Sequence, residues 1–119
     1  MLIKIVEPDF IHEDERGRLT QLVHDGYKQY NIVFSKKGVL RGNHYHRENE
    51  EAFFVITGGF RLTAEKDGIT EEYDFAEGDM FVIPHNVTHS FYYTEDTYLA
   101  SMYTLGVEKE NGEKDIFAE

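Results

Sequence analysis

The sequence predicts an all-β fold, a sandwich or barrel built as one domain. Short apolar runs recur along the chain, glycine-rich turns separate them, and no segment keeps a helical period. The chain has 119 residues, and its 40% hydrophobic content is enough for one core but not for two. We expect N-terminal strands in residues 1–27, the barrel in 28–106, and a charged tail in 107–119 that either covers the barrel surface or frays.

Nine strand-like runs support this fold, each rich in β-branched or aromatic residues and bounded by turn signals. The pair Gly58-Gly59 marks one turn, and Asp67-Gly68 is the kind of pair that closes a tight hairpin. In chain order the runs are LIKIV (2–6), LTQLVH (19–24), QYNIVF (29–34), AFFVIT (52–57), FRLTAE (60–65), ITEEYDF (69–75), MFVI (80–83), THSFYY (88–93) and TYLASMYTL (97–105).

Three histidines and one glutamate have spacings that predict a metal site. His44 and His46 are two apart, so on a strand both imidazoles point to the same face. Glu51 begins the next apolar strand, and His89 follows a proline turn much later in the chain. Three imidazoles and a carboxylate suit a divalent transition metal such as Mn, Fe, Co, Ni or Zn and leave one or two positions open to substrate. We therefore take all four as metal ligands and the three histidines also as catalytic candidates.

Other interpretations of these residues remain open. Buried histidines can be structural and neutral. Glu50 could replace Glu51 as a ligand, but it lies one residue out of phase on the alternating strand, so Glu51 is preferred. His85 lies in the turn and is expected at the rim. The chain has eight tyrosines, and nothing in the sequence says which of them lines a pocket.

The charge of the chain is uneven. A net charge of −11 argues against nucleic acid or an anionic membrane as partner. From Arg16 to Arg47, however, seven basic residues accompany one acidic residue, a charge of +6 against −17 for the remainder. We expect Arg41 and Arg16 to bind an anionic small molecule, and Arg41 needs a bend at Gly42 to turn toward it. The alternative is that these charges are solvated residues of loops and edge strands.

No feature of the sequence indicates export. The chain has no cysteine, so disulfides and thiolate sites are excluded. The N-terminus is too short and too soon acidic for a signal peptide, and no apolar run is long enough for a membrane span. We expect a cytoplasmic protein.

The spacing of the candidate ligands resembles the two motifs of the cupin family. Five residues separate Gly78 from Pro84 and four separate Pro84 from His89, as in the second motif, with Asn86 where the family usually has Gly. The resemblance implies a double-stranded β-helix, a jelly-roll barrel with a site inside it. The first motif is matched by Gly38, His44, His46, Glu51 and Gly58, separated by five, one, four and six residues.

Two further stretches resemble cupins that act on nucleotide-linked deoxysugars. Residues 14–19, DERGRL, are similar to a D-x-R-G-x-L element, and GVLRGNHYH is similar to an R-G-x-H stretch. Three groups remain open. The sugar 3,4-ketoisomerases work without metal and usually have Gln near Glu51. The rhamnose-pathway 3,5-epimerases have Gln where this chain has His46, and the cupin domain of capsular-polysaccharide enzymes is a metal binder.

The resemblance implies an isomerase or epimerase that transfers a proton next to the carbonyl of a nucleotide-linked or other sugar. Two alternatives are a non-catalytic metal- or metabolite-binding cupin and a ferrous dioxygenase. Cupins commonly cover their strand edges by pairing or swapping N-terminal strands, so we also expect a homodimer.

Overall fold

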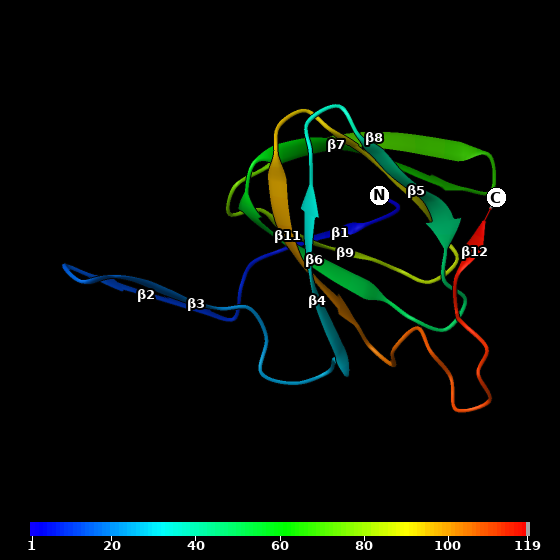
Figure 1. Cartoon of the computed structure of the whole chain (residues 1–119), viewed down its shortest axis with the longest axis horizontal. Coiled ribbons are helices and arrows are strands. Elements are labelled where there is room, and N and C mark those ends of the chain that lie inside the picture. The colour runs from blue at the N-terminus through cyan, green and yellow to red at the C-terminus, as the bar shows by residue number, and fades with distance from the viewer. Residues whose placement is uncertain (119) are drawn as a thin grey trace.

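Two five-stranded antiparallel sheets face each other in the computed structural model, which describes residues 1–118 (Figure 1). One sheet has the order β1-β9-β6-β11-β4 and the other β12-β5-β10-β7-β8. The strands of the first sheet are β1 (Lys4–Val6), β4 (Gln29–Ser35), β6 (Glu51–Thr57), β9 (Met80–Ile83) and β11 (Thr97–Tyr103). Those of the second are β5 (Leu40–Tyr45), β7 (Gly59–Lys66), β8 (Ile69–Ala76), β10 (Thr88–Tyr93) and β12 (Phe117–Ala118). This is the jelly-roll barrel that the resemblance to cupins implies.

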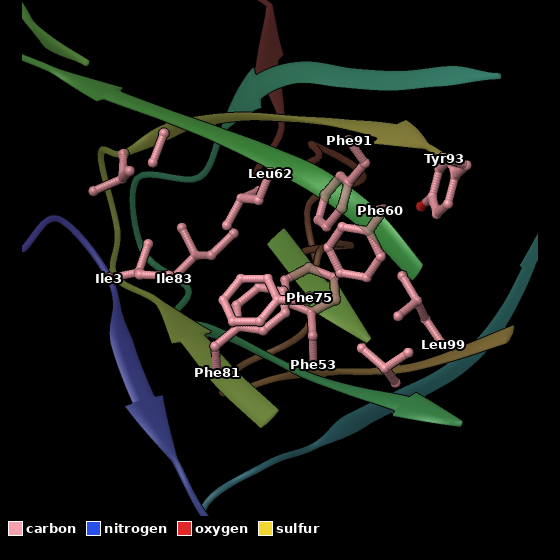
Figure 2. Packing of buried hydrophobic residues seen from close by; sticks show 13 residues of the cluster. Ile3, Phe53, Phe60, Leu62, Phe75, Phe81, Ile83, Phe91, Tyr93 and Leu99 are labelled. Carbon is pink, nitrogen blue, oxygen red and sulfur yellow. The ribbon is translucent and has the colours of Figure 1, made fainter. Parts of the chain in front are cut away.

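An aromatic cluster fills the space between the two sheets (Figure 2). Phe75 and Phe81 stack with ring centroids 4.2 Å apart, and Phe60 and Phe91 come within 5.2 Å of each other. Alternate residues of β7 are buried, as the period of two of a strand requires, whereas β9 is buried throughout because both of its faces are covered. Phe81 and Ile83 join the cluster between the sheets, and Met80 and Val82 belong to a second apolar cluster that includes Leu22 and Val23. Phe53, Phe91 and Leu99 of the cluster between the sheets also line the cavity that contains the candidate site.

The predicted hairpin turn between β7 and β8 is present. Asp67 and Gly68 both have positive φ, 52° and 79°, and Lys66 pairs with Ile69 across the two-residue loop. Aspartate tolerates this left-handed backbone and glycine adopts it without strain, which is why this pair closes such hairpins.

A separate hairpin of β2 (Phe10–Asp14) and β3 (Gly17–Gln21) projects from the barrel (Figure 1). Only part of it was expected as strand, because the predicted run 19–24 extends past β3 and residues 10–14 were not predicted at all. The two strands pair with each other alone among the described elements. Its apolar side chains Phe10, Ile11 and Leu19 are half or more exposed.

The C-terminal segment lies against the barrel. Glu108 pairs with Lys114, and β12 then adds to the edge of β5, with Phe117 opposite Tyr45. Residues 107–118 therefore cover part of the barrel surface, one of the two alternatives expected for this tail. Residue 119 lies outside the described residues. No helix within residues 1–118 has the length and apolarity to cross a membrane.

Candidate active site

A β-bulge shapes the strand that carries the paired histidines. His89 of β10 pairs with His44, but the next residue of β10 pairs with Gly42, so Asn43 is an extra residue on β5. Gly42 has a φ of 104° and Asn43 a φ of 63°. A Cβ at Gly42 would lie 2.7 Å from the carbonyl oxygen of His89, so only glycine fits. The bulge is the bend that Arg41 needs in order to face the same way as His44.

The three histidines converge at one point inside the barrel. The ring centroids of His44 and His89 are 4.6 Å apart, and those of His46 and His89 are 5.4 Å apart. Their candidate ligand nitrogens all lie within 4.8 Å of one another. His46 and His89 are fully buried, while His44 is half-buried and opens to the cavity. The topology therefore brings together the three imidazoles that the spacing singled out.

Glu51 completes this cluster. Its Oε1 lies 3.1 Å from Nε2 of His46 and 3.7 Å from Nε2 of His89, and its Oε2 accepts a 2.6 Å hydrogen bond from the Ser101 hydroxyl. Atoms that bind one ion at about 2.1 Å lie roughly 3–3.5 Å apart, so the spacing suits shared ligation. Glu50 lies outside the cavity lining, which contains Glu51.

Two backbone carbonyls orient the buried imidazoles. Nδ1–H of His46 donates to the carbonyl of Asp115 at 2.6 Å, and Nδ1–H of His89 donates to the carbonyl of Val87 at 3.0 Å. Each Nε2 is therefore directed into the cluster, the arrangement typical of metal-binding histidines. Nε2 of His89 has no hydrogen-bond partner among residues 1–118, although it is buried. A buried nitrogen without a partner is costly, and a metal ion would satisfy it. The donor set therefore fits a divalent transition metal.

Burial and neighbouring charges shift the pKa values of the site in different directions. Burial lowers the pKa of His89 to about 4 and, together with nearby His46, lowers that of His44, so both are neutral at pH 7. Burial also disfavours a charged His46, but its hydrogen bonds to Glu51 and Asp115 outweigh this effect and raise its pKa. Burial, then the charge of Glu51, raises the pKa of Tyr103, which stays protonated.

A cavity of about 240 Å³ lies in front of the histidines. His44, His89 and Glu51 form its polar base, and Arg41 lies on its wall, where Nε donates to the Ser35 hydroxyl at 2.7 Å. The rest of the lining is Asn31, Val33, Gly42, Phe53, Phe91, Tyr93, Leu99, Ser101 and Tyr103. A polar base and apolar walls are typical of a small-molecule site.

Sequence reasoning missed the two tyrosines and the serine of this lining. Ser101 and Tyr103 are two and four residues beyond Leu99, so one face of β11 carries all three into the barrel. On β10, Tyr93 is four residues beyond His89, so the two side chains lie on the same face of the strand. Counting along each predicted strand in steps of two, from a residue already assigned to the interior, could have identified these three residues.

Arg16, the other predicted substrate ligand, is not at the cavity. It lies at the tip of the β2–β3 hairpin, where its guanidinium donates to the Asp14 carboxylate at 2.7 Å. It lines no part of this cavity within the described chain. His85 is exposed in the turn after β9, as expected.

Two facing antiparallel sheets with a histidine cluster between them are the architecture of a cupin. Residues 12–107 match the sequence model of the polysaccharide biosynthesis C-terminal domain, and the chain belongs to that family.

One curated protein and several solved structures are similar to this chain. The chain is 27% identical over 107 residues to the spore coat polysaccharide biosynthesis protein SpsL of Bacillus subtilis (strain 168), a match covering 77% of this chain and 71% of that protein. A 3,4-ketoisomerase from Helicobacter canadensis has a similar structure, with a TM-score of 0.83 at 18% identity over 100% of this chain and 92% of the other. The 3,5-epimerase RmlC of Legionella pneumophila Philadelphia 1, in complex with dTDP-4-keto-L-rhamnose, has a TM-score of 0.72 at 26% identity over 86% and 66%.

Proposed function

We propose that this protein is an isomerase or epimerase that moves a proton next to the carbonyl of a nucleotide-linked sugar in polysaccharide biosynthesis. The observation that carries the proposal is His44, a half-buried imidazole that opens to the cavity and has a lowered pKa. A neutral imidazole can accept a proton at pH 7. The similar ketoisomerase and epimerase, and the family of the chain, support the same class of reaction.

We further propose that His44, His46, His89 and Glu51 hold a divalent transition metal, one of Zn, Mn, Fe or Ni. The support is the convergence of the three imidazoles, the position of the Glu51 carboxylate beside Nε2 of His46 and of His89, and the unpartnered Nε2 of His89. When bound, such an ion would act as a Lewis acid on the substrate carbonyl. Binding of the metal would displace the proton shared by His46 and Glu51, so the fraction of sites occupied by metal would rise with pH.

The residues that move the proton depend on whether a metal is held. In the metal-free site His44 accepts the proton from the sugar carbon, and Tyr103, a protonated phenol on the opposite wall, donates one. With an ion bound to the histidines, the cavity-lining phenols of Tyr93 and Tyr103 remain as proton donors, because burial raises the pKa of both and keeps them protonated. Apolar walls from Phe53, Phe91 and Leu99 exclude water from this step.

Arg41 is the proposed ligand of the diphosphate. It is the one arginine in the cavity lining of the described chain, and it enters that lining through the bulge at Gly42. A guanidinium matches the geometry of phosphate oxygens, and the solved RmlC complex contains a dTDP-linked sugar.

A homodimer would give Arg16 a role as well. The hairpin exposes Phe10, Ile11 and Leu19, and a two-stranded hairpin is marginal on its own. We propose that it packs on a second copy of the chain. Because Arg16 does not reach the cavity of its own chain, it can bind substrate only in the partner's cavity.

A deuterium and oxygen assay tests the proposed reaction. The purified protein is incubated with a dTDP-4-keto sugar in deuterated water while oxygen is monitored. Deuterium uptake at the carbon beside the ketone, without oxygen uptake, is the expected result. Oxygen consumption would indicate a ferrous dioxygenase, and a thermal shift with neither reaction would indicate a binding protein.

A further inference from the structure

Asp115 is a fully buried carboxylate in the C-terminal segment, and the matched family region ends before it, at residue 107. Its side chain accepts three backbone hydrogen bonds from consecutive residues, Arg47 at 2.8 Å, Glu48 at 3.0 Å and Asn49 at 3.0 Å. A fourth comes from the Asn49 amide at 2.8 Å. These donors belong to the loop that connects β5 to β6, so one carboxylate fixes nearly the whole connection from His46 to Glu51.

The same residue contacts His46 through its backbone. Its carbonyl oxygen accepts the 2.6 Å hydrogen bond from Nδ1–H of His46, which directs Nε2 toward Glu51. The side chain and the main chain of Asp115 therefore act on the two ends of one short segment. Movement of Asp115 would alter both the loop and the imidazole.

Other contacts hold this part of the segment in place. Asn49 accepts hydrogen bonds from the backbone N–H groups of Leu105 and Gly106, which ties the loop to the end of β11. The Arg47 guanidinium lies 4.0 Å from the centre of the Phe117 ring, and Tyr45 packs on the same ring. Asp115 thus lies between two anchored points, the end of β11 and the β12–β5 pairing.

We propose that residues 107–118 form a clasp in which Asp115 positions His46 and Glu51 for the reaction. Asp115 is a positioning residue, since it does not line the cavity and would not touch substrate. The inference rests on the proposed function only in assuming that His46 and Glu51 serve the site. The expected contribution is the ten- to hundredfold effect typical of residues that orient metal or catalytic ligands.

The variant Asp115→Asn tests the clasp because it leaves the backbone carbonyl intact. One carboxylate oxygen becomes an NH₂ group, which cannot accept from the backbone N–H groups. Any change at His46 then reports movement of the segment rather than loss of the atom that His46 contacts. Glu113→Gln is the matched control, because it removes the same charge from an exposed side chain of the same segment.

Two readouts separate this inference from the proposed function. The first is ¹⁵N NMR of His46 in the metal-free protein, where the Nδ1–H signal should be slow to exchange in the wild type and in Glu113→Gln but lost or exchange-broadened in Asp115→Asn. The second is Zn²⁺ titration, where Asp115→Asn should bind about 10- to 100-fold more weakly. The NMR readout stands even if the wild type binds no metal and isomerises no sugar.

Unchanged His46 signals and unchanged Zn²⁺ affinity in Asp115→Asn would overturn the clasp. If that variant does not fold, the wild type alone decides the question. A slowly exchanging Nδ1–H with scalar coupling to the Asp115 carbonyl supports the clasp, and a fast-exchanging Nδ1 overturns it.

Discussion

The histidine cluster and the β2–β3 hairpin lie in the same small protein but are built in opposite ways. In the cluster each side chain is held by a different element: His46 by the C-terminal segment, Glu51 by Ser101 of β11, and His89 by the backbone of Val87. In the hairpin, Arg16 pairs with Asp14 and Arg18 with Glu13, all within the same hairpin. The chain completes its cluster by itself, whereas its hairpin lacks a partner within residues 1–118.

This difference indicates where each region obtains its stability. Buried polar groups are stable only when their partners are fixed, so the cluster needs contributions from across the sequence. A two-stranded hairpin with exposed apolar side chains is marginal by itself, and in the proposed dimer the second copy would stabilise it. Changes in the cluster should therefore affect metal binding, stability and chemistry, and changes in the hairpin should affect association.

The largest effect is expected for Glu51→Gln. Removing the carboxylate charge should weaken binding of one divalent transition metal per chain by about a thousandfold, or about 4 kcal/mol, while the barrel still folds. Metal content by elemental analysis and Zn²⁺ titration measure it. Glu50→Gln is the control, because Glu50 does not line the cavity, and equal losses in the two variants would contradict the assigned ligand.

Gly42→Ala should be the most destabilising single change at the bulge. The added Cβ meets the His89 carbonyl oxygen at 2.7 Å and also strains a φ of 104°, so we expect a loss of about 3 kcal/mol. Gly26→Ala serves as the comparison. Gly26 has a φ of 90° but nothing within 4 Å, so only the strain of about 1 kcal/mol applies. Urea unfolding of the two variants gives the difference, and similar losses would argue against the bulge contact.

Acid should destabilise the metal-free barrel through His89. Its pKa falls from 6.5 when unfolded to about 4 when folded, so between these values the unfolded state binds the extra proton. The contribution of His89 should fall by about 3 kcal/mol as pH drops from 6.5 to 4, at 1.36 kcal/mol per unit, and should not change further below pH 4.

The exposed His24 should change stability with pH in the opposite direction to His89. Its pairing with Asp9 raises its pKa, so the stabilisation that this pair contributes is present below pH 6.5 and is lost as pH rises. Urea unfolding across this pH range should show a flatter profile for His89→Gln and little change for His24→Gln. If the free energy of unfolding falls as steeply with acid in His89→Gln as in the wild type, a group other than His89 is responsible.

Arg41→Ala should weaken binding of thymidine diphosphate by about 1.5–3 kcal/mol, the loss of a charged hydrogen-bond partner, and added salt should reduce wild-type binding. Titration calorimetry measures it. Arg18, which pairs with Glu13 on the hairpin, provides an arginine control. No heat and no thermal shift with the wild type at millimolar ligand would remove the sugar-nucleotide proposal.

The smallest effect on the barrel itself is expected from the hairpin. Leu19→Ser removes an apolar group that is 57% exposed, so we expect less than about 0.5 kcal/mol in the unfolding of one chain. The dimer should nevertheless dissociate. Light scattering of the wild type should give about twice 13.9 kDa at micromolar concentration, and a monomeric wild type would refute the dimer.

The sequence predicts the barrel and the histidine cluster well for a physical reason. Motif spacing fixes both the strand phase and the turn positions, so His44, His46 and Glu51 could be assigned to one interior. The contribution of Asp115 could not be predicted, because its 66 to 69 residue separation from its partners depends on the path of an irregular segment. The position of Arg16 on the hairpin could not be predicted either, because the pattern of charge along the sequence does not show where a segment lies in the fold.

Proton exchange into the sugar tests the central claim most directly. Wild-type protein and Glu51→Gln are each incubated with a dTDP-4-keto sugar in deuterated water and followed by NMR. The account predicts deuterium at the carbon next to the ketone with the wild type, and a rate at least about a hundredfold lower with Glu51→Gln. A wild type that binds the sugar nucleotide, as shown by a thermal shift, yet incorporates no deuterium would contradict it.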